Sequence, residues 1–147
     1  MLPIIAIYLS FKELNFDQEE AYNNTMEISQ SMARKIKRKN HALSRLPFGY
    51  SLFKVFCKSI MNKEYPKEGW DVEWQKYDNK EIHFDITRCV YIETTERYGC
   101  PELCSVFCAN DTTTFSGYKP KIIFERQGTI GQGQKLCDFH FKKWEFL

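Results

Sequence analysis

Five of the six cysteines in this 147-residue chain lie in its C-terminal half, between Cys89 and Cys137. A thiol can act as a nucleophile, bind a soft metal ion or fill space in a core. The function predicted from the sequence depends on which of these three uses applies.

The segment 101–115 is predicted to be a helix, because Pro101 suits the first helical position. Cys104, Cys108 and Asp111 recur in it at spacings of four and three, which places them on one helical face. Side chains lean toward the helix N-terminus, where unpaired N–H groups lower the pKa of a thiol. Two thiols beside a carboxylate therefore indicate chemistry rather than packing.

Cys89 ends a predicted strand, at a point where a pocket can open, and we predict that it is the nucleophile. Cys108 and Asp111 are expected to flank it from the helix. In strict alternation Cys89 shares a strand face with His83, but His83 is too far along the strand to act as its base. The base must come from another element, and the candidates are Asp111, Asp138 and His140.

Metal binding is the alternative use of the thiols. The spacing of Cys104 and Cys108 is that of neither a zinc ribbon nor a ferredoxin, yet cysteines four apart on a helix can share an ion. Cys89 and Cys137 could complete such a site. Because Cys137 alternates with apolar residues, it is equally well read as a core thiol. We expect no metal and no cofactor, and retain the four-cysteine site as the alternative.

The first part of the chain is predicted to be helical. Apolar residues recur at helical spacing from Ile4 to Leu14, and Asp17 with Glu20 forms a capping box at the start of a second helix. Pro47 is expected to open a third helix. The buried stripe of that helix is predicted to consist of Leu52, Phe53, Phe56 and Ile60.

Near residue 69 the spacing of apolar residues changes from helical to every second residue. Alternating segments around 72–76 and 82–87 predict a first hairpin, and two helices, 91–98 and 101–115, should follow. A second hairpin, with Ile122 and Phe124 on one strand and Cys137 on the other, closes the chain. Its connection, 128–133, carries three glycines and is either a turn or a loop that closes over a substrate.

These elements predict one α+β domain over 1–147, with 1–65 mainly helical and 69–147 arranged as hairpin, helices and hairpin. The N-terminal helices should pack on an antiparallel sheet of about four strands. The two hairpins form that sheet, and two helices lie between them in the chain.

Composition narrows the classes of function. The chain is 43% hydrophobic and 16% aromatic with a net charge of +2, which fits a globular protein and predicts no nucleic-acid partner. The basic run 34–39 reads as a solvated helix face, with an anionic partner as the alternative. No segment has the roughly 20 apolar residues of a membrane span. Residues 2–11 do not read as a signal peptide, so we expect free thiols in the cytoplasm; a secreted, disulfide-bonded domain is the alternative.

Several of these residues also carry a family resemblance. The motifs Phe84-x4-Cys89, Pro101-Glu102-Leu103-Cys104-x2-Phe107-Cys108-x2-Asp111, Phe124-x-Arg126-x2-Thr129-x3-Gly133 and Cys137-Asp138-Phe139 resemble the L-2-amino-thiazoline-4-carboxylic acid hydrolase family. The resemblance covers most of the chain. It implies hydrolytic opening of a small cyclic amidine to a carbamoyl-cysteine, which would make the chain a hydrolase of C–N or C–S bonds.

Combining the resemblance with the chemistry of the residues, we expect Cys89, Cys104, Cys108 and Asp111 to be catalytic. A substrate carboxylate favours a bidentate cation, for which Arg126 and Arg88 are the candidates. The full set expected to bind substrate is Arg88, Arg126, Thr129, Cys137 and His140. The expected partner is a small molecule, and a homo-oligomer is compatible with the sequence. A non-catalytic module that binds a small ligand or a metal is the alternative.

Overall fold

The computed structural model describes residues 1–144, and across them five α-helices and a four-stranded antiparallel sheet confirm the predicted α+β class. The α-helices are α1 (Leu2–Glu13), α2 (Gln18–Ser44), α3 (Gly49–Glu64), α4 (Val90–Arg97) and α5 (Cys104–Phe115). The strands are β1 (Trp70–Tyr77), β2 (Glu81–Cys89), β3 (Ile122–Glu125) and β4 (Cys137–Lys143), in the sheet order β1-β2-β4-β3. Three short 3₁₀ turns are η1 (Pro101–Leu103), η2 (Ser116–Tyr118) and η3 (Ile130–Gln132). The end of the predicted domain, 145–147, lies outside the described residues.

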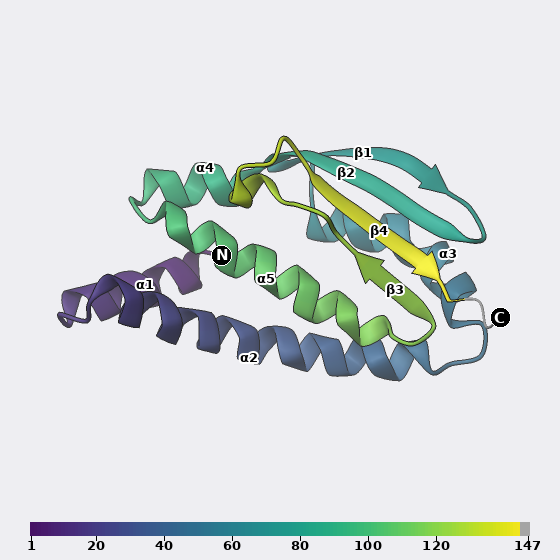
Figure 1. The fold of residues 1–147 in the computed structure, drawn as a ribbon, viewed down its shortest axis with the longest axis horizontal. Helices are drawn as coiled ribbons and strands as arrows, with labels where there is room; N and C mark the ends of the chain where they lie inside the picture. The colour runs from purple at the N-terminus through teal and green to yellow at the C-terminus, as the bar shows by residue number, and fades with distance from the viewer. Residues whose placement is uncertain (145–147) are drawn as a thin grey trace.

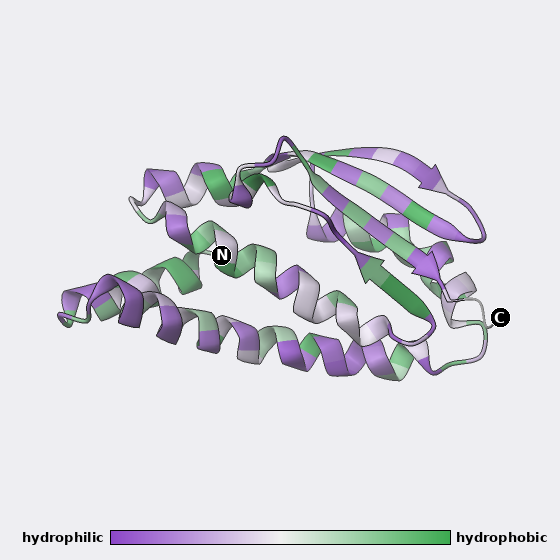
Figure 2. Ribbon diagram, viewed as in Figure 1, coloured by the Kyte–Doolittle hydropathy of each residue, from purple (hydrophilic) through white to green (hydrophobic). Residues whose placement is uncertain are grey.

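The helices lie against one face of the sheet, with α5 between the sheet and α2 (Figure 1). This inner face is apolar because alternate residues of each strand point to it, a pattern visible as alternating colours along the strands (Figure 2). Phe141 of β4 packs there against Phe53 of α3 and Phe115 of α5, each with ring centroids 5.1 Å apart. A second apolar cluster joins α1, α2 and the start of α5.

The helix starts agree with the sequence only in part. The capping box of α2 is confirmed, since Asp17 accepts a hydrogen bond from the Glu20 amide at 2.8 Å and Glu20 accepts one in return at 3.2 Å. The prediction that Pro47 opens a helix is wrong. The chain turns through Phe48 in the left-handed region, and α3 begins at Gly49. No helix within residues 1–144 combines the length and the apolar character needed to cross a membrane.

The buried face of α3 also differs from the prediction. The prediction is confirmed for Phe53, which is buried together with Cys57 and Met61. The other predicted core residues, Leu52, Phe56 and Ile60, are 42%, 57% and 38% exposed. Both sets have helical spacing, so α3 carries two neighbouring apolar faces. The sheet covers only one of them, and the periodicity alone does not say which.

A β-bulge in the pairing of β1 with β2 decides which way Cys89 points. In β2 the pairing runs from Arg88 opposite Asp71 directly to Ile86 opposite Val72, so Thr87 is an extra residue. An extra residue reverses the alternation beyond it. Cys89 therefore faces inward with Ile86, and not outward with His83 as strict alternation predicted.

Candidate thiol active site

Three thiols meet where the end of β2 lies over the start of α5. The Cys104 side chain lies beside those of Cys89 and Cys108, and the sulfurs of Cys104 and Cys108 both lie against Gly131. The helical spacing brings Cys104 and Cys108 to one side of α5, and the bulge in β2 turns Cys89 toward them. Strict alternation would place Cys89 on the strand face of His83, and the bulge reverses that placement.

The cluster has an unequal distribution of protons. Hydrogen bonds to Cys108 and Cys89, together with burial, raise the pKa of Cys104 far above that of a free thiol, so Cys104 keeps its proton. Its thiol donates to Cys108 and lowers the pKa of Cys108 to about 7. Burial opposes this shift, while the Thr129 side chain and the charge of Arg126 support it. A thiol with a pKa near 7 is substantially ionised at neutral pH, and the thiolate is the nucleophilic form.

Cys89 is a second acceptor for the same donor. The Cys104 side chain and the backbone N–H groups of Tyr91 and Ile92, at the start of α4, lower the pKa of Cys89. Because the Cys104 thiol has a single hydrogen, it serves Cys89 or Cys108 at any moment. The three sulfurs therefore titrate as one coupled group.

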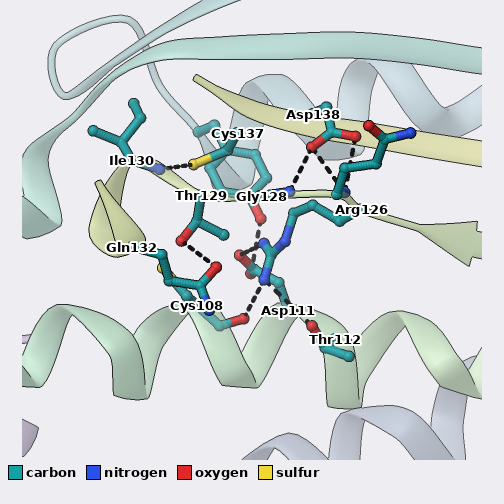
Figure 3. A network of polar contacts seen from close by, with 12 residues as sticks. Cys108, Asp111, Thr112, Arg126, Gly128, Thr129, Ile130, Gln132, Cys137 and Asp138 are labelled. Carbon is teal, nitrogen blue, oxygen red and sulfur yellow. Dashed lines mark hydrogen bonds and ion pairs between the residues drawn. The ribbon is translucent and has the colours of Figure 1, made fainter. Parts of the chain in front are cut away.

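An ion pair lies one turn further along α5 (Figure 3). Arg126 donates to the Asp111 carboxylate at 3.1 Å and to the carbonyl oxygen of Cys108 at 2.7 Å. Tyr65 donates to the other oxygen of Asp111 at 3.0 Å. The Arg126 and Asp111 side chains are only 8% and 21% exposed. Burial raises the pKa of Asp111 to about 6, against the opposing effect of Arg126.

Comparison with known proteins now bears on this site. The sequence model described as L-2-amino-thiazoline-4-carboxylic acid hydrolase matches residues 3–141. The chain belongs to this family. No curated protein is detectably similar to it. Among solved structures, a trafficking protein particle complex subunit 3 from Naegleria fowleri, covalently bound to palmitic acid, is 10% identical with a TM-score of 0.43, over 99% of this chain and 98% of that one.

In this member of the thiazoline-carboxylate hydrolase family, a loop covers the thiols. Thr129 is 1% exposed and its hydroxyl lies within reach of both Cys108 and the Gln132 side chain, the latter at 3.2 Å. A Cβ added to Gly131 would lie 2.9 Å from the Cys104 sulfur and 3.2 Å from the Cys108 sulfur. Only glycine fits at that distance without displacing a sulfur. The cover leaves Cys104 buried and Cys89 and Cys108 partly exposed.

Cys137 anchors this loop. It is separate from the thiol trio, which consists of Cys89, Cys104 and Cys108. Its sulfur accepts a hydrogen bond from the Ile130 amide at 3.2 Å (Figure 3), and burial raises its pKa to about 12. Asp138 accepts hydrogen bonds from the Gln127 and Gly128 amides, each at 3.0 Å. Cys137 and Asp138 together hold the backbone at Gln127, Gly128 and Ile130, where the loop begins.

Three of the predicted residues, His140, Asp138 and Arg88, lie away from the thiols. His140 alternates with buried Phe139 and Phe141, so it lies on the outer face of the sheet, next to His83. Asp138 lies on that face as well, so neither can be the base for inward-facing Cys89. Arg88 is directed away from Cys89 and hydrogen-bonds to Glu93 of α4 at 2.9 Å.

Three further parts of the chain contribute to the surroundings of the thiols and of Asp111. They are Tyr65, Gly131 and the backbone at the start of α4, and none of them follows from a motif. Three surface hollows, one beside Phe56, one beside His83 and one beside His41, are lined by residues other than the thiol trio. Among the same residues no group of three or more histidine, cysteine or acidic side chains is arranged to hold a metal ion, so the four-cysteine metal site gains no support.

Proposed function

We propose that the chain is a thiol-dependent hydrolase that opens L-2-amino-thiazoline-4-carboxylate to a carbamoyl-cysteine. Membership of the family supports the substrate class. The observation that carries the chemistry is geometric: the sulfurs of Cys104 and Cys108 lie together beneath Gly131, beside the buried Arg126–Asp111 ion pair. These surroundings lower the pKa of Cys108 to about 7. A thiolate present at neutral pH can attack an amidinium carbon.

We assign the role of nucleophile to Cys108, whereas the sequence predicted Cys89. Both thiols have lowered pKa values, but Cys108 also has the Arg126 charge and the Thr129 hydroxyl beside it. The hydroxyl has one hydrogen to share between Cys108 and Gln132, and a thiolate is the stronger acceptor because it is charged. Ionisation of Cys108 should therefore draw the Thr129 hydroxyl from Gln132 to the sulfur.

The reaction proceeds in two balanced steps. The Cys108 thiolate adds to the carbon between the ring sulfur and nitrogen, and the bond from that carbon to the ring sulfur breaks. The ring sulfur leaves as a thiolate and takes up a proton from solvent. Water then adds to the same carbon and expels the Cys108 thiolate; one proton of this water returns to solvent and the other stays on the product. The net change is addition of one water molecule, with no oxidation and no cofactor.

Asp111 and Arg126 act as positioning residues in this proposal. The Asp111 carboxylate and the Cys108 carbonyl hold the guanidinium beside the thiol. Arg126 is thereby occupied within the protein, so it supports the thiolate charge and is not offered to a substrate carboxylate. Asp111 in turn has both oxygens engaged, by Tyr65 and Arg126.

Cys108 is partly exposed, and movement of the loop from Thr129 to Gly133 away from the sulfurs would widen the access of a substrate to it. The close fit of Gly131 restricts access to both sulfurs. This favours the alternative function, a non-catalytic module that binds a small ligand. The module would bind the thiazoline without converting it. We place either activity in a reducing cytoplasm, with a small molecule as the partner.

The two functions are separated by incubating the protein with L-2-amino-thiazoline-4-carboxylate and measuring the carbamoyl-cysteine by liquid chromatography and mass spectrometry. Hydrolysis by the wild type and the Cys57→Ala control, but not by Cys108→Ser, supports the proposal. Cys57 is a suitable control because it is buried in α3, outside the trio. Ligand-induced stabilisation without product would instead identify the binding module.

A further inference from the structure

The outer face of the sheet carries a histidine pair that the thiol chemistry does not use. His83 of β2 and His140 of β4 are direct partners in the strand register, and their ring centroids are 3.8 Å apart. Side chains directly opposite each other on antiparallel strands start from Cβ atoms about 4.5–5.5 Å apart. Two imidazoles in this arrangement can direct one nitrogen each toward a common point above the sheet.

A buried carboxylate orients one of these rings. Asp85, 9% exposed, lies 3.1 Å from Nε2 of His83 through one oxygen, and its other oxygen accepts a hydrogen bond from Gln75 at 2.9 Å. Gln75 is the extra residue of a bulge in β1, which directs its side chain to this carboxylate. With Nε2–H donating to Asp85, Nδ1 of His83 keeps its lone pair. A carboxylate behind a histidine is the usual second shell of a metal ligand.

The pair opens into a polar hollow of about 620 Å³, lined by both histidines and by the chain around Gln127 and Gln134. The hollow gives a hydrated ion access from solvent. Asp138 also lines it, but both of its oxygens accept backbone hydrogen bonds from Gln127, and one accepts a further bond from Gly128. The two imidazoles are the ring-nitrogen donors that line the hollow, and Asp85 and Lys135 line it as well.

We propose that His83 and His140 together bind a divalent transition-metal ion, such as Ni²⁺, with water in the remaining coordination positions. Imidazole nitrogen is a preferred ligand for such ions. Nitrogens bound side by side at 2.0–2.1 Å from an ion lie about 3 Å apart, and the ring centroids of the two histidines are 3.8 Å apart. Within residues 1–144 no group of three or more donors is arranged to hold an ion, so the proposed site has two protein ligands.

The chain supplies a matched control for a test. Its third histidine, His41, is exposed in α2, away from the sheet. Titration with Ni²⁺, followed by calorimetry and by the melting temperature, should show one saturable site with a dissociation constant of about 10–100 μM. His83→Gln and His140→Gln should each weaken binding at least about tenfold, because either change removes half of the chelate. His41→Gln should bind like the wild type.

Thiol binding of the same ion is distinguished by these variants, because the trio lies on the inner face and is unchanged in all of them. If His140→Gln binds Ni²⁺ as tightly as the wild type, or if the wild type shows no saturable binding below 1 mM, the proposal is wrong. The Asp85→Asn variant should weaken binding several-fold through loss of ring orientation. Circular dichroism of each variant establishes that the loss is not one of folding.

Discussion

The two faces of strands β2 and β4 carry two different clusters of reactive groups. On the inner face the thiols of Cys89, Cys104 and Cys108 lie beneath a loop and share hydrogen bonds. On the outer face His83 and His140 lie side by side in an open hollow. One extra residue, Thr87, decides that Cys89 joins the inner cluster.

The difference between the faces lies in what surrounds each group. Thiols on the inner face have lost most of their water, so neighbouring groups decide which sulfur is charged. Histidines on the outer face keep access to water, so their chemistry depends on what arrives from solvent. The inner face therefore suits a nucleophile with a shifted pKa, and the outer face suits a ligand site.

The largest expected effect is on the inner face. Cys108→Ser should lower turnover of the thiazoline by about 10³-fold or more, because a hydroxyl is a far weaker nucleophile than a thiolate at neutral pH. Cys89→Ser should retain measurable turnover, since Cys89 does not form the covalent intermediate in our mechanism. If Cys89→Ser is inactive while Cys108→Ser is active, the roles of the two thiols must be exchanged.

Replacement of Arg126 tests how strongly burial of the Arg126–Asp111 ion pair affects the free energy of unfolding. Arg126→Met leaves Asp111 buried without its partner, and the free energy of unfolding should fall by about 3 kcal/mol. Loss of the guanidinium raises the pKa of Asp111 further above its value in the unfolded chain. The native variant then binds a proton more tightly than the native wild type does. Its deficit relative to the wild type should therefore shrink as the pH falls toward about 6, the pKa of Asp111 in the wild type, and should stay constant below it. Urea unfolding at pH 5 and pH 8 measures this.

Arg88→Met is the matched control, because Arg88 pairs with Asp71 and Glu93 on an exposed surface. Its free energy of unfolding should change by less than about 1 kcal/mol. If the two arginine variants lose equal free energies of unfolding, burial of the Arg126–Asp111 pair does not increase the cost of breaking it.

The loop cover can be tested by a double-mutant cycle. Gly131→Ala places a Cβ against the Cys104 and Cys108 sulfurs and should cost about 1–3 kcal/mol of stability through overpacking. The same change in a Cys104→Ala background should cost less, because the nearer sulfur is gone. An identical cost in both backgrounds would mean that the loop does not rest on the thiols.

The smallest expected effect concerns the hydroxyl that the loop contributes. Thr129→Val keeps the shape of the side chain and removes a hydrogen-bond donor to Cys108. The pKa of Cys108 should therefore rise, and its rate of alkylation at pH 7 should fall several-fold. An unchanged rate would remove Thr129 from the account.

Much of the fold could be predicted from local patterns. The switch from helical to alternating periodicity located the two hairpins, and Asp17 with Glu20 located the start of α2. The buried face of α3 could not be predicted, because Phe53 and Phe56 both belong to apolar stripes. Only the position of the sheet distinguishes them.

The site could be predicted where it depends on one helix. Cys104 and Cys108 share a helical face by spacing alone, and their sulfurs meet. Cys89 required knowledge of the bulge at Thr87, which depends on how β2 pairs with β1. The contact of Gly131 with the sulfurs depends on how the loop folds back over α5, so no motif contains it.

The central claim is that Cys104 keeps the proton of the trio and Cys108 loses one near neutral pH. Alkylation of the native protein by iodoacetamide, resolved at Cys108 by mass spectrometry and followed from pH 5 to 10, measures this directly. Our account predicts a rate that rises with an apparent pKa of about 7, displaced upward when Cys104 is replaced by alanine. A Cys108 that reacts with an apparent pKa of about 8.5 or above in the wild type, as an ordinary thiol does, would contradict it.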